Sequence, residues 1–309
     1  MLLLAGAEYG RIAQALQANK KQIEIMASED RAWTHDDGLA APDVGPWAEE
    51  KHRMVSLYST LFSSGMKAKW SRRIYVELYA GAGHSRIRDT SKFILGSPLL
   101  ALKVKDPFDK YVFCEEKPTN LKALKVRARQ VSPNAEIVYV QGDCNRRTSE
   151  ILAEIPRGST EDTVLSLCFA DPFDLGLEFE TIRALADARF VDFLVLLALG
   201  MDANRNYEHY LREDADKVDK FLGSKSWRQR WATAQWDAVK FTRFLADEFT
   251  KSMASLGYIP PPHYTMKEVR SHEKNLALYR LALFSRNPRA YKFWDQVLKY
   301  STDQKTLFD

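Results

Sequence analysis

Acidic residues at the ends of short apolar segments are the side chains of this chain that could do chemistry. The first, Glu77, is followed by Gly81 and Gly83, and three more acids close later segments: Glu115, Asp143 and Asp171. Glycine permits positive φ and, without a side chain, lets the backbone come close to a ligand. An ionised carboxylate only accepts hydrogen bonds, so it selects a ligand that carries donors such as hydroxyls or amines. This pattern is typical of a nucleotide-binding site.

Glu115 and Asp143 suit two different parts of a nucleotide. An acid after the second strand of such a domain can accept hydrogen bonds from ribose hydroxyls, and an acid after the third can accept from the exocyclic amine of adenine. The glycine turn lacks the third glycine of the G-x-G-x-x-G pattern, which disfavours a nicotinamide dehydrogenase. Two alternatives stay open: a site for ATP or another adenine nucleotide, and acids that are only solvated at strand ends.

Strands and helices must alternate to position these acids. Apolar segments predict five strands, the last almost wholly apolar, as in a strand covered on both faces: 74–79, 111–115, 136–143, 164–171 and 191–199. Helical spacing predicts helices over 47–62 and 118–129, and the tail adds two strands, 264–270 and 276–284, and a helix, 288–300. The predicted fold class is α/β, a doubly wound, mainly parallel seven-stranded sheet with an antiparallel C-terminal edge.

Changes in composition along the chain predict four parts. Residues 1–45 are expected to form an N-terminal helix, over 8–26, and a linker that contains Asp, Gly and Pro. Residues 46–203 form the core that carries the acids. Residues 204–258 are helical in pattern and read as an insertion or cap for substrate selection, and residues 259–309 complete the core.

Composition narrows the class of protein. The chain has 309 residues, of which 45% are hydrophobic and 28% charged, which is ample for a packed core. No apolar run approaches the roughly 20 residues that span a bilayer and no export signal is visible, so we expect a cytoplasmic protein without membrane contact. The 3 cysteines fit reduced thiols, and no metal-ligand spacing is present. A net charge of +4 is compatible with nucleic acid without requiring it.

The bacterial three-Cys-motif partner proteins resemble this chain over about residues 47–300. The motifs that carry the resemblance are, in order, Tyr75-Val-Glu-Leu-Tyr-Ala-Gly-Ala-Gly-His-Ser-Arg-Ile-Arg88, Gly96-Ser-Pro-Leu-Leu-Ala-Leu102, Gly142-Asp-Cys-Asn145, Asp171-Pro-Phe173 and Gly200-Met-Asp-Ala-Asn-Arg-Asn206. That family is similar to class I S-adenosylmethionine-dependent methyltransferases and is paired with a second protein that bears the cysteine motif. The resemblance implies a Rossmann-like methyltransferase fold, S-adenosyl-L-methionine as cofactor and a three-Cys-motif protein as partner.

The methyltransferase resemblance also implies roles for single residues. Four would line the methionine and ribose side of the cofactor: Glu77, Tyr79, Gly81 and Gly83. The family usually has a shorter Asp in place of Glu77, so the contact made by this carboxylate could be displaced. Glu115 would hold the ribose hydroxyls, and Asp143 would meet the adenine amine with Cys144 as an apolar edge beside the ring.

Asp171-Pro-Phe-Asp174 is the candidate reaction centre, because it resembles the D/N-P-P-aromatic loop of amino methyltransferases without its second proline. The resemblance implies that Asp171 accepts hydrogen bonds from the target amine, that Phe173 stacks on the base, and that Pro172 lies in the loop between them. Asp174 is assigned to acceptor binding. The alternative is structural: Pro172 ends the strand and Phe173 packs into the core.

Asn204, Arg205 and Asn206 follow the fifth strand and could contact the acceptor from the other side of the crevice. Asn can read a base edge and Arg can pair with phosphate. The alternative is a loop of capping residues, since Asn favours turns. Closer to the glycine turn, Ser97 is expected to cap a helix that has Pro98 in its first turn.

Two further clusters allow a nucleic-acid or a structural interpretation. Ser85, Arg86 and Arg88 are expected to contact phosphate or to lie at a solvated helix end. In the segment that holds Arg228 and Arg230, arginines and tryptophans could grip a backbone and stack on unpaired bases. Its tryptophans include two that are four apart, which favours a core stripe: Trp227, Trp231 and Trp236.

Two functions are therefore carried forward. The first is an S-adenosylmethionine-dependent methyltransferase-like enzyme that acts on an amino group, with a nucleobase of a nucleic acid as one acceptor, and works with a cysteine-motif protein. The second is a non-catalytic binding or scaffold subunit that keeps the nucleotide-binding fold. The intact acids favour the enzyme.

Overall fold

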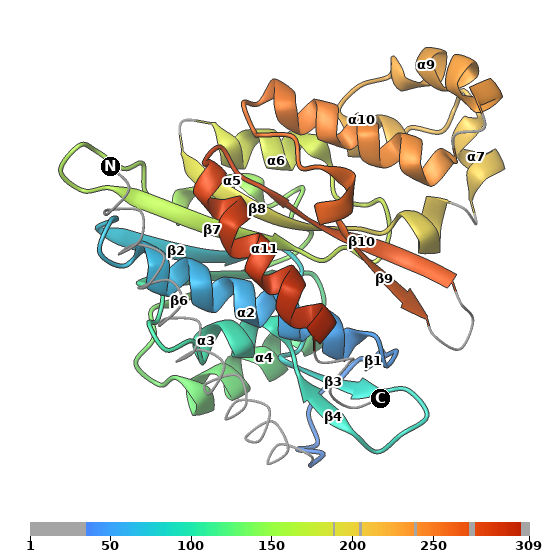
Figure 1. Ribbon diagram of the computed structural model, residues 1–309. Coiled ribbons are helices and arrows are strands. Elements are labelled where there is room, and N and C mark those ends of the chain that lie inside the picture. The colour runs from blue at the N-terminus through green and yellow to red at the C-terminus, as the bar shows by residue number, and fades with distance from the viewer. Residues whose placement is uncertain (1–34, 188, 204–205, 238–239, 272–275, 304–309) are drawn as a thin grey trace.

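A seven-stranded sheet forms the centre of the structure (Figure 1), a computed structural model that describes residues 35–187, 189–203, 206–237, 240–271 and 276–303. The strands are, in spatial order, β6 (Ile137–Gln141), β5 (Lys110–Glu115), β2 (Arg72–Glu77), β7 (Val164–Ala170), β8 (Phe190–Leu197), β10 (Leu276–Phe284) and β9 (Lys267–Ser271). The first five are parallel, whereas β10 pairs antiparallel with both β8 and β9. The predicted α/β sheet with an antiparallel edge is confirmed.

The carboxyl ends of β2, β5 and β7 meet at one edge of the sheet. From β2 the chain adds β5 and then β6 on one side, and it returns to add β7 and β8 on the other side. In an open α/β sheet, the crevice at such a reversal of strand order is where ligands bind. All residues of β7 are buried, so contact with a ligand falls to the loop that follows this strand.

Helices cover both faces of the sheet (Figure 1). One face packs against α2 (Ala48–Met66), α3 (Ser97–Leu102), α4 (Pro118–Val131) and α11 (Pro288–Asp303), and the other against α5 (Thr148–Ala153), α6 (Phe179–Ala186) and α10 (Phe241–Ser255). Because successive strand side chains point to opposite faces, Tyr75 of β2 packs on the α2 side while Ile74 and Val76 pack on the α6 side. The sheet thus lies between two hydrophobic cores, one on each face.

A small sheet separates the glycine turn from the helix that follows it. Its strands are β1 (Asp43–Val44), β3 (His84–Ile87) and β4 (Phe93–Leu95). Arg86 lies in β3, where its Nε is 2.7 Å from Oδ1 of Asp43. The predicted helix end at Ser85, Arg86 and Arg88 is therefore wrong, because these residues belong to a hairpin and its turn and the helix begins only at Ser97.

A helical cap follows β8. It begins with a π-helical turn, η1 (Leu199–Ala203), and continues through α7 (Tyr207–Leu211), α8 (Lys217–Leu222), α9 (Trp227–Ala234), the 3-10 turn η2 (Gln235–Asp237) and α10. Trp227 and Trp231 are buried, which confirms the core stripe, whereas Trp236 is 83% exposed. Arg228 pairs with Asp219, and Arg230 pairs with Glu248. These arginines stabilise the cap itself.

The strand predicted over 264–270 begins later than expected. A 3-10 turn, η3 (His263–Thr265), takes up the first of these residues, and β9 starts at Lys267. The backbone N–H of Thr265 donates to the carbonyl of Pro262 at 2.9 Å, which closes the turn. The helix predicted over 8–26 lies outside the described residues. Within the described parts, every helix is too short or too polar to cross a membrane.

Candidate functional site

A cavity of about 300 Å³ lies at the carboxyl ends of β2, β5 and β7. We call it the carboxyl-end cavity. Its lining includes nine of the residues that sequence singled out: Tyr79, Gly81, Gly83, Glu115, Asp143, Cys144, Asp171, Pro172 and Phe173. Residues from four separate predicted segments thus meet at one hollow, where the reversal of strand order places it.

The glycine turn has the backbone that glycine alone adopts easily. Gly81 has φ 65° and Gly83 has φ 80°. A Cβ on Gly83 would lie 3.1 Å from Leu124 Cδ1 of α4 and 3.2 Å from Leu99 Cδ1 of α3. Gly83 therefore allows two helices to close against the turn, and Gly81 leaves the backbone open toward the cavity.

Glu115 is fixed by three hydrogen bonds at the end of β5. Its Oε2 accepts from the backbone N–H of Gly81 at 2.8 Å, and its Oε1 accepts from the N–H of Lys117 at 2.9 Å and from Nδ2 of Asn120 at 3.2 Å. A carboxylate offers about four acceptor positions, so it can take further donors from a ligand. Glu115 thus joins the glycine turn to α4 and presents an acceptor to the cavity.

Asp143 and Cys144 follow β6 on the same side of the cavity. Oδ1 of Asp143 accepts from the N–H of Asn145 at 2.9 Å, an Asx turn that holds the carboxylate at the strand end. Cys144 is buried, and burial raises the pKa of its thiol to about 11. The thiol is therefore neutral at physiological pH and forms an apolar wall.

Asp171 and Phe173 follow β7 and differ sharply in their surroundings. The carboxylate of Asp171 forms an ion pair with Lys51 of α2. Phe173 is 81% exposed although the neighbouring Pro172 is buried. The structural alternative, in which Phe173 packs into the core, is wrong: the proline takes the buried position and the ring projects outward.

Glu77 is placed differently from the other acids. It is fully buried and does not line the cavity; instead it accepts from the Tyr75 hydroxyl at 2.9 Å and from the Ser97 hydroxyl at 2.5 Å. Burial raises the pKa of Glu77 to about 8, against the effect of these two hydrogen bonds. Glu77 was predicted to line the methionine side of the cofactor, and this prediction is wrong: the hydroxyls of Tyr75 and Ser97 hold its carboxyl away from the cavity.

The hydrogen bond to Glu77 also shows that the role predicted for Ser97 is wrong. It was expected to cap α3, but the N-cap of that helix is Gly96, and no side chain caps it. The Ser97 hydroxyl donates to Glu77 instead. Pro98 does lie in the first turn of α3, as predicted.

The remaining acceptor-side residues lie between the Phe173 loop and the cap. Asp174 accepts from Nζ of Lys217 at 2.7 Å, and Nδ2 of Asn206 donates to Oδ1 of Asp202 at 2.5 Å. Nζ of Lys217 also lies 3.4 Å from Asp202. Lys217, Asp174 and Asp202 therefore connect the loop after β7 to the helical cap. Neither Asp174 nor Asn206 lines the carboxyl-end cavity, and Asn204 and Arg205 lie outside the described residues.

Sequence reasoning missed Lys51 and His52 of α2, which both line the carboxyl-end cavity. Lys51 is only 9% exposed. Burial, and then the charge of Lys51, lower the pKa of His52 to about 3, so its ring is neutral. A signal was present: Lys51 stands one and two helical turns before Val55 and Tyr58, both buried, so a charged residue occupies the apolar face of a predicted helix.

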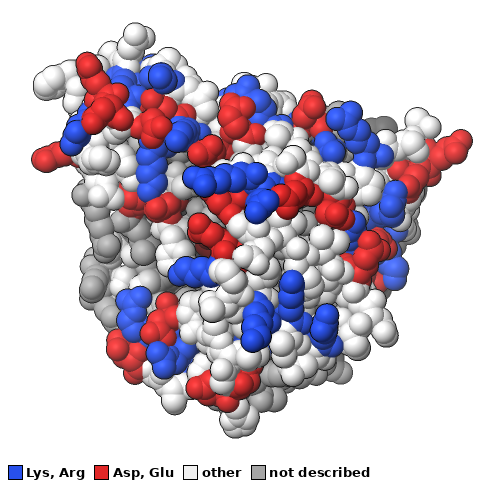
Figure 2. Space-filling view, turned by 180° about the vertical axis from the view of Figure 1, so that it is seen from behind, with Lys and Arg blue, Asp and Glu red and all other residues white. Residues whose placement is uncertain are grey.

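Two basic residues between α2 and the start of β2 are paired with acids. Arg72 pairs with Asp162, and Nζ of Lys67 lies 2.8 Å from Asp106. On the face of the molecule drawn in Figure 2, basic and acidic side chains are interspersed over the surface. Charge alone therefore does not mark a nucleic-acid surface on this face.

No known family model matches this chain, and no curated protein sequence matches it. Among solved structures, it is similar to an O-methyltransferase from Bacillus cereus in complex with SAH, at 9% identity and a TM-score of 0.42, covering 86% of this chain and 90% of that one. It is also similar to the O-methyltransferase TomG from Streptomyces achromogenes in complex with SAM, at 9% identity and a TM-score of 0.41, covering 74% of this chain and 79% of that one. The similarity to Trm1 from Pyrococcus horikoshii with S-adenosyl-L-methionine has 12% identity and a TM-score of 0.39, and it covers 80% of this chain and 58% of that one.

The strand order itself defines the fold class. A seven-stranded, mostly parallel sheet flanked by helices, with its antiparallel strand β10 inserted beside β8, is the Rossmann-like methyltransferase architecture. The fold predicted from the sequence is confirmed. The resemblance to three-Cys-motif partner proteins stays a prediction.

Proposed function

We propose that this chain is an S-adenosyl-L-methionine-dependent methyltransferase that acts on an amino group of a nucleobase. The observation that carries the proposal is one cavity at which Glu115, Asp143 and the glycine turn face a loop with a partly buried, ion-paired Asp171 and an exposed Phe173. A cofactor site and an acceptor site would then share one hollow. Methyl transfer requires that proximity, because it is a displacement that gains chiefly from alignment of the reacting atoms.

The residues present suit S-adenosylmethionine, which when bound supplies a methyl group on a positively charged sulfur. Glu115 would accept from the ribose hydroxyls, because its fixed carboxylate retains acceptor positions. Asp143 would accept from the adenine amine, with the neutral Cys144 thiol against the ring. Gly81 and Gly83 have positive φ, which glycine adopts because it carries no side chain, and this absence of side chains would leave room for the methionine part.

Asp171 and Phe173 give the acceptor preference. An ionised carboxylate accepts hydrogen bonds and donates none, so Asp171 would select an N–H over a carbonyl oxygen. The pairing with Lys51 fixes the direction of the Asp171 carboxylate. Phe173 offers an exposed aromatic face on which any base can stack. A base within a duplex would have to be flipped out to reach it.

The cysteine-motif partner belongs to the same proposal and rests on the sequence resemblance. Co-expression of this chain with a three-Cys-motif protein, followed by size-exclusion chromatography, tests it. We expect the two chains to elute together at a stoichiometric ratio. Separate elution at micromolar concentrations would remove the partner from the proposal and leave the cofactor assignment untouched.

Calorimetric titration of the full chain with S-adenosylmethionine tests the cofactor site. We expect binding by the wild type, a loss of about tenfold or more in affinity for Glu115→Gln, and a similar loss for Asp143→Ala, because each removes a charged acceptor. Glu161→Gln, which removes the same charge from an exposed loop, serves as the matched control. If the wild type does not bind S-adenosylmethionine, the hypothesis of an enzyme is overturned and that of a non-catalytic scaffold subunit is favoured.

Transfer from tritium-labelled cofactor to single-stranded oligonucleotides that contain adenine or cytosine tests the reaction. Asp171→Asn keeps the size of the side chain but adds a donor, so we expect cofactor binding to persist and turnover to fall by about a hundredfold. Unchanged turnover in this variant would refute the assigned reaction centre. Labelling of uracil-only strands at the same rate would refute the amino acceptor.

A further inference from the structure

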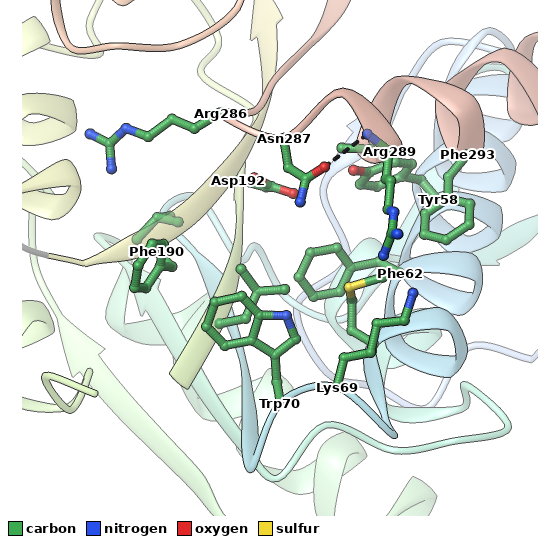
Figure 3. Close-up of a pocket in the computed structure, with 14 residues that line it drawn as sticks. Tyr58, Phe62, Lys69, Trp70, Phe190, Asp192, Arg286, Asn287, Arg289 and Phe293 are labelled. Atoms are coloured by element: carbon green, nitrogen blue, oxygen red, sulfur yellow. Dashed lines mark hydrogen bonds between the residues drawn. The ribbon is translucent and has the colours of Figure 1, made fainter. Parts of the chain in front are cut away.

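A second cavity, of about 290 Å³, lies at the opposite ends of the strands from the first. Figure 3 shows the residues that line it. We call it the amino-end cavity, because its floor comes from the start of β7 at Leu165 and the start of β8 at 190–192. Helix α2 forms one wall with Tyr58 and Phe62, and α11 forms another. No residue of the proposed cofactor site lines it.

Aromatic rings surround the amino-end cavity. Phe62, Trp70, Phe190 and Phe293 all line it, and the rings of Trp70 and Phe190 lie 5.2 Å apart at an angle of 58°. Phe190 is 61% exposed, which is unusual for a large apolar side chain at a strand end. Such a lining favours a flat, unsaturated ligand over a flexible aliphatic one.

Two buried polar groups face this apolar space. Asp192 is buried at the floor, and burial raises the pKa of its carboxyl to about 7, while a hydrogen bond from Ser285 opposes that shift. The hydroxyl of Tyr58 is fully buried and has no hydrogen-bond partner among the described residues.

Positive charge stands at the mouth of the cavity. Lys69 and Arg289 are exposed residues that line it (Figure 3). Arg286 also lines the cavity, but its guanidinium donates to the carbonyls of Leu256 and Arg189, so it has a structural role. An anionic group on a ligand at this mouth would lie beside the positive charges of Lys69 and Arg289.

We propose that the amino-end cavity binds a mononucleotide whose base carries an exocyclic amine. The base would lie among Phe62, Trp70 and Phe190, its amine would donate to Asp192, and its phosphate would meet Lys69 and Arg289 at the mouth. The volume accommodates one base, with sugar and phosphate toward solvent. This site is separate from the proposed methyltransferase site and does not depend on it.

Calorimetric titration of the full chain with cytidine and uridine monophosphates at about pH 8.5, above the pKa of about 7 of Asp192, tests the site, because the two nucleotides have the same size and charge and differ in the exocyclic amine. We expect the cytidine nucleotide to bind about tenfold tighter. Asp192→Asn replaces an acceptor by a group that both donates and accepts, so this preference should disappear. Lys69→Ala should weaken cytidine monophosphate severalfold and leave the uncharged nucleoside unchanged, and Lys225→Ala, an exposed lysine of the cap, should change neither.

Two outcomes would overturn the proposal. Equal binding of the two nucleotides by the wild type, or no binding at millimolar concentration, would remove the role of Asp192. Loss of nucleotide binding in Glu115→Gln would place the ligand in the carboxyl-end cavity instead. If Asp192→Asn fails to fold by circular dichroism, Lys69→Ala and Phe190→Ala, which alter exposed side chains, decide the matter: unchanged affinity in both overturns the site.

Discussion

Lys51 and Asp171 form an ion pair in the carboxyl-end cavity although 120 positions separate them in the chain. Lys51 comes from α2, which precedes the central strand, and Asp171 follows β7 on the far side of that strand. The pair is largely shielded, with side chains 11% and 19% exposed. It therefore fixes the direction of the Asp171 carboxylate and connects α2 to the Phe173 loop.

Replacing Lys51 by Met removes the charge and keeps an unbranched side chain. We expect turnover to fall by roughly tenfold to a hundredfold, because Asp171 loses the group that orients it, and stability to fall by roughly 2 kcal/mol. Affinity for S-adenosylmethionine should change less than about threefold, since Lys51 is assigned to Asp171 and not to the cofactor. Single-turnover methyl transfer and calorimetry measure the two effects separately.

Lys51→Arg separates positioning from mere packing. It restores a cation within reach of Asp171, so it should recover part of the turnover lost in Lys51→Met while stability recovers too. A Met variant as active as the wild type would contradict the positioning role. So would an Arg variant that regains stability without any gain in turnover.

Phe173 can be tested with little risk to folding, since it is 81% exposed. Phe173→Ala should raise KM for an oligonucleotide acceptor by roughly fivefold to a hundredfold, which corresponds to the loss of one base–aromatic stack. Its melting temperature should match the wild type. Tyr264→Ala, at a residue that is 84% exposed and lines neither cavity, is the matched control, and an equal rise in KM there would argue against a specific stack.

Arg127 anchors the segment before α2 to the glycine turn. Its buried guanidinium donates to Asp37 Oδ1 at 2.6 Å, to the carbonyl of Ala40 at 2.8 Å and to that of Ala82 at 2.7 Å. Arg127→Lys cannot reach all three, so we expect a loss of about 3 kcal/mol and a melting temperature lower by roughly 4–6 °C. Differential scanning calorimetry measures it. Exposed Arg129→Lys should stay within about 1 °C, and equal shifts in both would refute the anchor.

The strands and most of the cavity could be predicted from the sequence because each of the parallel strands contains an apolar run that is followed by a polar residue. Glu115, Asp143 and Asp171 were found this way. The parallel sheet then brings strand ends together at one edge, so residues far apart in the chain become neighbours. That reasoning depends only on topology.

Contacts between side chains could not be predicted in this way. Glu77 has the right position at the end of β2, yet the hydroxyls of Tyr75 and Ser97 hold it below the cavity. Lys51 reaches Asp171 from a helix that the motif does not include. The hairpin after the glycine turn was also missed, since β3 and β4 are short and carry charged residues such as Arg86.

The environment of Glu77 predicts how stability depends on pH. Burial raises its pKa from the usual 4.5 to about 8 in the folded protein. Below pH 4.5 both folded and unfolded states are protonated, so this group contributes nothing to the pH dependence. Between pH 4.5 and about 8 the unfolded state ionises while the folded state keeps its proton, so the free energy of unfolding falls as pH rises. Above that range the contribution is constant.

Glu77→Gln cannot ionise and keeps an acceptor for one of the two hydroxyls. We therefore expect the stability of this variant, relative to the wild type, to increase steadily as pH rises through the window set by the two pKa values of Glu77. Urea unfolding at several pH values in that window measures it. Asp192, whose pKa burial raises to about 7, contributes a fall of the same sign to both proteins and cancels in the difference. Glu161→Gln should follow the wild type at every pH, and a Glu77→Gln curve parallel to the wild type would show that Glu77 ionises equally in both states.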